Sequence, residues 1–159
     1  MARAPHRTRS PVSGQRGLTL HLRRATRQGR VPGVAALRQW ATLALGRRAR
    51  GRELSVLVVG PARSRSLNHR YRGQDHATNV LTFDYMEKPV RADIVICVPV
   101  VRAEARAQSK TFRDHLAHLL LHGILHAQGH DHATHGQARR MEGRERRLLA
   151  RLHIADPYR

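Results

Sequence analysis

The chain has 159 residues and a single cysteine, Cys97, and it has no long apolar run. One cysteine excludes an internal disulfide, and its place inside the apolar segment 94–98 favours a buried, small hydrophobic side chain. No stretch approaches the ~20 apolar residues that a membrane-spanning helix needs. No apolar run follows the basic first residues, as it would in a secretory signal. These absences predict a cytoplasmic protein that does not span a membrane.

Aromatic residues are also scarce, at 4% of the chain, and Trp40 is the only tryptophan. Proteins that grip single strands by base stacking usually expose several aromatic rings, so stacking is excluded as the main mode of binding. Acidic residues are few as well: 11 Asp and Glu stand against 30 Lys and Arg, which gives a formal net charge of +19. An excess of this size predicts a polyanionic partner that is held mainly by charge.

Lysine contributes little to this surplus, since Lys88 and Lys110 are the only lysines. Arginine binds phosphate through paired hydrogen bonds and stays charged at any working pH. A GC-rich genome would explain arginine in place of lysine, but not the excess of basic over acidic residues. The composition therefore favours a nucleic acid as the partner.

Residues 1–17 are rich in Arg, Pro, Ser and Gly, which predicts a disordered basic arm that either touches RNA or is inert. Residues 18–159 are expected to form a single domain. Apolar periodicity and end signals predict strands at 18–22, 54–59, 79–83 and 92–97. They predict helices at 32–46, 63–71, 101–109 together with Pro99, 111–128 and 136–152.

This order of elements predicts an α/β (α+β) domain with one mixed, mostly four-stranded sheet covered by several helices. The third and fourth strands are joined by a connection too short for a crossover helix, which predicts some antiparallel pairing.

Histidines in the C-terminal half form the strongest functional pattern. His122 and His126 are one turn apart on a predicted helix and share a face. Gly129 can adopt a left-handed conformation and end that helix, so that the chain turns back and brings His132 toward the same ion. Three neutral imidazoles favour zinc and leave a fourth position for water, which is typical of catalytic zinc sites. The pattern predicts one zinc ion per chain, and such an ion can lower the pKa of bound water to ~7.

Neighbouring residues leave alternatives open. Four histidines fall near one face of the same predicted helix: His115, His118, His122 and His126. A metal site one turn earlier, on His118 and His122, would lack a glycine turn and a suitably spaced third ligand. Asp131 either hydrogen-bonds a ligand histidine or caps the turn, and His130 is expected to be exposed. A histidine-rich surface stretch without a metal is the remaining interpretation.

The spacing of these histidines also matches the metzincin metalloproteases, in which a glutamate follows the first histidine and acts as general base. Gly123 stands at that position here, so a protease of that class would lack its base. Together with the surplus of arginine, this glycine favours a phosphodiester over a peptide as the substrate.

At these residues the sequence resembles the bacterial YbeY endoribonucleases. The segment from His122 to His132 is similar to the family signature His-Gly-x-Leu-His-x-x-Gly-x-Asp-His. Residues 67–75 resemble its Leu-Asn-x-x-Tyr-Arg-x-x-Asp segment, and residues 78–83 resemble its Thr-Asp/Asn-Val-Leu-Ser-Phe strand. The resemblance covers about residues 18–159, with departures from the usual family residues that include Ala92, Asp84 and His130.

The resemblance implies zinc at His122, His126 and His132, and it singles out Arg72, whose planar cation could bind the scissile phosphate. It implies cleavage of single-stranded RNA, maturation of small-subunit ribosomal RNA and ribosome quality control. Implied partners are the small ribosomal subunit, one of its proteins and a ribosome-assembly GTPase. The alternative is a ribosome-assembly factor that binds RNA and has a structural zinc.

Overall fold

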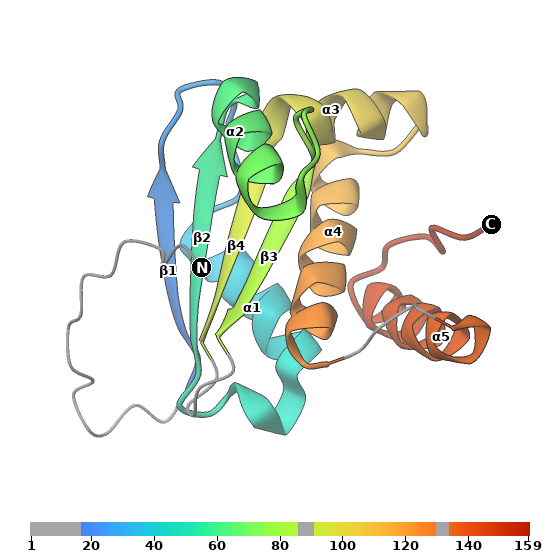
Figure 1. Ribbon diagram of the computed structural model, residues 1–159. Coiled ribbons are helices and arrows are strands. Elements are labelled where there is room, and N and C mark those ends of the chain that lie inside the picture. The colour runs from blue at the N-terminus through green and yellow to red at the C-terminus, as the bar shows by residue number, and fades with distance from the viewer. Residues whose placement is uncertain (1–16, 86–90, 130–133) are drawn as a thin grey trace.

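One sheet with the strand order β1-β2-β4-β3 forms the centre of the molecule (Figure 1). The computed structural model describes residues 17–85, 91–129 and 134–159. The strands are β1 (Thr19–Arg24), β2 (Glu53–Val59), β3 (Val80–Tyr85) and β4 (Arg91–Cys97). β1, β2 and β4 run parallel, and β3 pairs antiparallel with β4. The predicted mixed sheet and its antiparallel pair are therefore confirmed.

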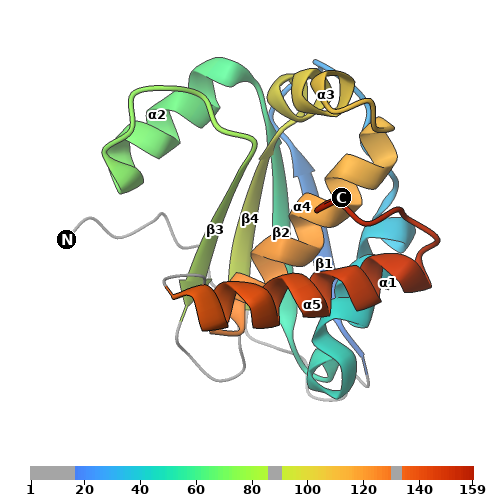
Figure 2. The same cartoon turned by 90° about the vertical axis from the view of Figure 1, so that its right-hand side faces the viewer.

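Helices cover both faces of this sheet. In the described residues they are α1 (Val34–Leu45), the short 3-10 helix η1 (Gly46–Ala49), α2 (Pro61–Arg72), α3 (Val98–Ala107), α4 (Phe112–Ala127) and α5 (His135–Arg151). α1 and α4 lie on one face, α2 lies on the other, and α5 packs against α4 on the side away from the sheet (Figures 1 and 2).

The two-residue alternation of the strands explains why both faces carry helices. On β4, Ile94 and Ile96 point into the larger core, which α1 and α4 complete. Val95 and Cys97 point the other way, into a smaller cluster that Leu67 of α2 joins. A central strand buried on both faces reads as a continuous apolar run. Cys97 is free and buried, as its sequence environment predicted.

α4 is the central helix of the domain and contacts α1, α3, α5 and β3. Thr111 caps its N-terminus by accepting a hydrogen bond from the Asp114 backbone N–H, which satisfies one of the unpaired amides of the first turn. After the helix, Gly129 has a φ of 84°, the left-handed conformation predicted for it. Both ends of the helix that carries the histidines were therefore predictable from local signals.

Other boundaries differ from the sequence prediction by a few residues. α5 begins at His135 because Thr134 and Gln137 form a reciprocal capping box. α3 begins at Val98, one residue before Pro99, which was expected to be helical together with residues 101–109. Pro99 fits its first turn because the backbone amides there lack helical acceptors. η1 was not predicted.

The basic arm predicted at residues 1–17 lies outside the described residues except for Gly17. The division into an arm and a single domain at 18–159 therefore stays a prediction. In the part of the chain that the structure describes, no helix is both long enough and apolar enough to cross a bilayer.

Truncation of Leu120 tests whether α4 organises the core. Leu120 is fully buried, so Leu120→Ala should lower the free energy of unfolding by about 2–5 kcal/mol. Leu22 on β1 is only partly buried, so the same change there should cost about 1–2 kcal/mol. Urea denaturation of both variants measures the two losses. Equal losses would contradict the central position of α4.

Candidate active site

The C-terminal half of α4 brings two of the predicted ligands together. The ring centroids of His122 and His126 are 4.7 Å apart, and both side chains are only partly buried. The shared helical face predicted for them is therefore present. The third predicted ligand, His132, lies outside the described residues, as do His130 and Asp131. Within the described ranges, no group of three or more His, Cys, Asp or Glu side chains is arranged to hold a metal.

The earlier histidines on α4 have other partners. His115 is 4% exposed, and its Nε2 lies 2.8 Å from Glu104 Oε2 on α3. His118 Nε2 lies 3.5 Å from Glu145 Oε2 on α5. The rings of His118 and His122 are 6.3 Å apart, farther than those of His122 and His126. These contacts favour the pair His122 and His126 over a site one turn earlier.

Glu145 is the residue that the sequence analysis missed. It lies on α5 and is fully buried, and its Oε1 lies 2.6 Å from His122 Nδ1 on α4. The hydroxyl of Tyr158 donates a hydrogen bond to its other oxygen, Oε2. A signal for Glu145 exists in the sequence, because it is the one charged residue among the buried positions of the α5 stripe. No pattern in the sequence assigned a role to Tyr158.

Burial raises the pKa of the Glu145 carboxyl, but contacts from His118, His122 and Tyr158 outweigh it and lower that pKa to about 2. Glu145 is therefore an ionised carboxylate at neutral pH. In the other direction, burial and the hydrogen bond to Glu145 raise the pKa of the Tyr158 hydroxyl, which keeps its proton.

Arg72 reaches the edge of the sheet from the C-terminal end of α2. Its side chain is exposed, and its Nη2 donates a 3.1 Å hydrogen bond to the carbonyl of Thr82 on β3. β3 is an edge strand with β4 on one side only, so a carbonyl on its outer side has no strand partner. The bond to Thr82 holds the guanidinium at this outer edge.

The side chain of Thr82 faces α4. A Cβ added at Gly123 would lie 2.6 Å from Thr82 Oγ1, closer than any stable contact permits. α4 can therefore approach β3 only because residue 123 has no side chain. Thr82 contacts Arg72 through its carbonyl and the position next to His122 through its side chain. The structure thus brings Arg72 to the strand against which the histidine helix packs.

The contact between α4 and Thr82 also explains why a glycine follows His122. A glutamate after the first histidine, as in the metalloprotease pattern, would collide with Thr82 at this position. The absence of that base is therefore a requirement of the packing between α4 and β3.

Polar contacts fix the loop between α2 and β3. Ser64 Oγ donates to the Thr78 carbonyl at 2.8 Å, and buried Asn68 donates through Nδ2 to the His76 carbonyl at 2.9 Å. Arg65 adds a two-point ion pair with Asp75, with both N–O distances at 2.7 Å. These bonds hold the end of α2, and hence Arg72, against β3.

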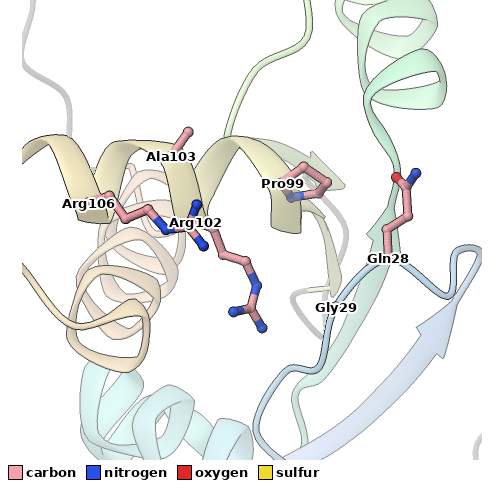
Figure 3. Close-up of a pocket in the computed structure, with 6 residues that line it drawn as sticks. All are labelled: Gln28, Gly29, Pro99, Arg102, Ala103 and Arg106. Carbon is pink, nitrogen blue, oxygen red and sulfur yellow. The ribbon is translucent and has the colours of Figure 1, made fainter.

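A pocket of about 280 Å³ lies between α3 and the loop after β1 (Figure 3). Its lining residues are Gln28, Gly29, Pro99, Arg102, Ala103 and Arg106. None of the predicted site residues lines it. The candidate site is therefore a surface built from α2, β3, α4 and α5, and it is separate from this pocket.

The fold is an α/β domain with one mixed four-stranded sheet, and the candidate site lies on its surface. A family model described as endoribonuclease YbeY matches residues 33–153. The chain therefore belongs to the YbeY family of RNA-cleaving hydrolases, as the motifs suggested.

Relatives support this membership over most of the chain. An endoribonuclease YbeY from Bordetella avium is 48% identical over 156 residues, which cover 92% of this chain and 96% of the relative. Another endoribonuclease YbeY, from Pseudomonas entomophila, is 47% identical over 147 residues, which cover 89% of this chain and 93% of that relative. The fold is similar to the solution structure of TM1509 from Thermotoga maritima. That structure has a TM-score of 0.58 at 24% identity, and the match covers 85% of this chain and 92% of that one.

Gly123→Ala tests the close approach of α4 and β3. In an unconstrained helix, alanine is about 1 kcal/mol more favourable than glycine. Here the collision with Thr82 should reverse the sign and cost about 1–3 kcal/mol. Thermal or urea unfolding measures the change.

Two controls separate the collision from helix propensity. Gly143→Ala on α5 meets only an ordinary 3.9 Å contact and should be neutral or stabilising. Thr82→Ala removes the Oγ1 atom, and the nearest remaining neighbour of the added Cβ is then Val80 Cγ1 at 3.8 Å, an ordinary contact. In that background the penalty of Gly123→Ala should therefore disappear. A penalty that persists without the Thr82 hydroxyl would show that another contact causes it.

Proposed function

We propose that this protein is a single-strand-specific endoribonuclease of the cytoplasm, which acts in the maturation of small-subunit ribosomal RNA and in ribosome quality control. The observation that carries the proposal is the convergence on Thr82 of Arg72 from one side and the His122 helix from the other. Membership of the endoribonuclease YbeY family supports it. The proposed substrate is ribosomal RNA on or near the small subunit, and a ribosomal protein and an assembly GTPase are proposed partners.

The proposed cofactor is one zinc ion per chain, held by His122, His126 and His132. The donors fit this group, because two imidazoles one turn apart share a face, and the Nδ1 atom of one of them already lies against a carboxylate. The segment after Gly129 supplies the third imidazole by its sequence. When bound, zinc would polarise a phosphoryl oxygen and lower the pKa of a coordinated water.

Arg72 is proposed to bind the scissile phosphate. Its guanidinium has five N–H donors in a rigid fork, and one terminal nitrogen is already oriented by Thr82. A planar cation fixed in advance stabilises the charge that develops on the phosphate in the transition state, without reorganising during the reaction. Arg72 would thus orient the phosphodiester and neutralise it.

Exposed arginines near the site suggest how a longer strand is held. α2 carries exposed Arg63, Arg65, Arg70 and Arg72, and α5 carries exposed Arg139, Arg140, Arg146, Arg147 and Arg151. Contacts of this kind grip the phosphate backbone without reading the base sequence. The second candidate function, an RNA-binding assembly factor with a structural zinc, is favoured by the same arginines but assigns no role to the orientation of Arg72.

The decisive experiment separates metal binding from catalysis. His126→Ala should lose both bound zinc and cleavage of a labelled single-stranded ribosomal RNA fragment. Arg72→Ala should keep one zinc per chain but lower kcat/KM by about 10²–10³-fold, the cost of removing one oriented donor to transition-state charge. Metal counting by mass spectrometry and single-turnover cleavage measure the two effects.

Arg63→Ala is the matched control, because it removes an exposed arginine from the other end of the same helix. It should change cleavage by only a few-fold, through lost phosphate attraction. Cleavage that is equal in the wild type and in the His126 and Arg72 variants would point to a contaminating nuclease. Zinc binding without any cleavage would favour the assembly factor.

RNA affinity should depend steeply on salt. Each phosphate neutralised on a single strand contributes about −0.7 to the slope of log K against log salt. Filter binding of an uncleavable RNA between 50 and 200 mM salt, roughly the range in which such losses are large, measures the slope. Arg140→Ala on α5 should make the slope shallower by about 0.7 if α5 contacts the strand. An unchanged slope would remove α5 from the interface.

A further inference from the structure

The burial of Glu145 requires an explanation beyond helix packing. Its side chain is fully buried on the apolar face of α5, and the other buried residues of that helix are Met141, Leu148 and Leu149. An ionised carboxylate in such a place costs several kcal/mol unless it is paired and hydrogen-bonded. Among the described residues, its partners are two histidines of α4 and the hydroxyl of Tyr158, none of them a permanently charged group.

We infer that Glu145 is a positioning residue for His122: it holds the imidazole in the Nδ1–H tautomer and so directs Nε2 to the metal, while Tyr158 holds Glu145 in place. The inference rests on the proposed function only in taking His122 as a metal ligand.

The hydrogen-bond chemistry of the two oxygens sets the tautomer. A carboxylate can only accept, so the proton in the 2.6 Å contact between Glu145 Oε1 and His122 Nδ1 belongs to the imidazole. In the neutral ring, the lone pair is then on Nε2. Tyr158 donates to the other oxygen, Oε2, which leaves Oε1 for His122 and fixes the rotation of the carboxylate. A ligand histidine oriented through its other nitrogen binds metal more tightly.

The segment after α5 is what completes this arrangement. Tyr158 packs edge-on against His118, with ring centroids 5.7 Å apart, and the Arg146 guanidinium lies 5.3 Å from its ring centre. Asp156 accepts a 2.9 Å hydrogen bond from the Tyr158 backbone N–H and pairs with Arg146 at 3.2 Å. The end of the chain thus runs back along α5 (Figure 2), and the ring of Tyr158 reaches His118 on α4. Tyr158 is 39% exposed, so its ring adds little to the core. Its specific contact is the hydrogen bond from its hydroxyl to Glu145.

Two measurements test the inference. Long-range ¹H–¹⁵N NMR of the metal-free protein, above the pKa of imidazole, reports the tautomer of His122. Competition with a chelator reports the dissociation constant of zinc. The wild type should show the Nδ1–H tautomer.

Glu145→Met keeps the length of the side chain but removes the acceptor. It should shift His122 toward the Nε2–H tautomer and weaken zinc binding about 10–100-fold. Glu145→Gln keeps an oxygen acceptor and should rescue much of both. Tyr158→Phe removes one hydroxyl at a partly exposed site and should weaken zinc binding by several-fold without unfolding the protein. Glu142→Gln, on the same helix but at the surface beside Arg146, is the control and should match the wild type.

The Nε2–H tautomer in the wild-type protein would overturn the inference. Zinc affinities of Glu145→Met and Tyr158→Phe equal to that of the wild type would also overturn it. If Glu145→Met does not fold, the wild-type tautomer and Tyr158→Phe still decide. A wild-type protein that binds no zinc would refute the proposed cofactor, whereas the tautomer would still show whether Glu145 orients His122.

Discussion

The close approach of α4 to β3 at Gly123 is the constraint on which the site depends. With no side chain at 123, the helix lies directly against Thr82. The same strand residue accepts the hydrogen bond that orients Arg72. Arg72 and the histidine helix come from elements far apart in the chain, and both contact the same strand residue. A larger residue at 123 would move the histidines away from the arginine.

Neighbouring helices give the histidines of α4 different surroundings. α3 supplies Glu104, which also accepts a hydrogen bond from Asn79 at 3.0 Å and so ties the start of β3 to His115. α5 supplies Glu145, which lies against His118 and His122. Buried polar groups need partners, and networks of this kind rigidify a core once they are satisfied. The partners on α3 and α5 therefore separate a structural histidine, His115, from those near the candidate metal position.

Acidic residues are too few to neutralise the basic surface, and several of them have specific contacts. Glu145 is fully buried and Glu104 is partly buried against His115. Asp75 and Asp156 bind arginines that hold the loop after α2 and the end of the chain. Most arginines on α2 and α5 consequently face solvent. A surface of this charge attracts RNA at long range. In the proposed function, Arg72 and His122 then orient only the bond that is cut.

The sequence by itself determined the features that depend on local periodicity and local chemistry. These include the alternating strands, the antiparallel pairing of β3 with β4, the Thr111 cap, the Gly129 end of α4 and the shared face of His122 and His126. Family motifs added Arg72, which composition alone did not distinguish from the other arginines. His132, the third predicted ligand, stays a prediction.

Only the tertiary structure decided which side chains meet across elements. Glu145 is 23 residues from His122 in the chain, and Arg72 is 10 residues from the carbonyl that orients it. A helical period shows that Glu145 lies on an apolar stripe, but not which helix covers that stripe. The physical reason is that hydrophobic burial is non-directional, so the pattern on one helix does not specify its partner. The partner is set by the packing of the whole domain. That packing also decides that the Tyr158 hydroxyl meets Glu145 Oε2 and that α4 contacts Thr82 at Gly123.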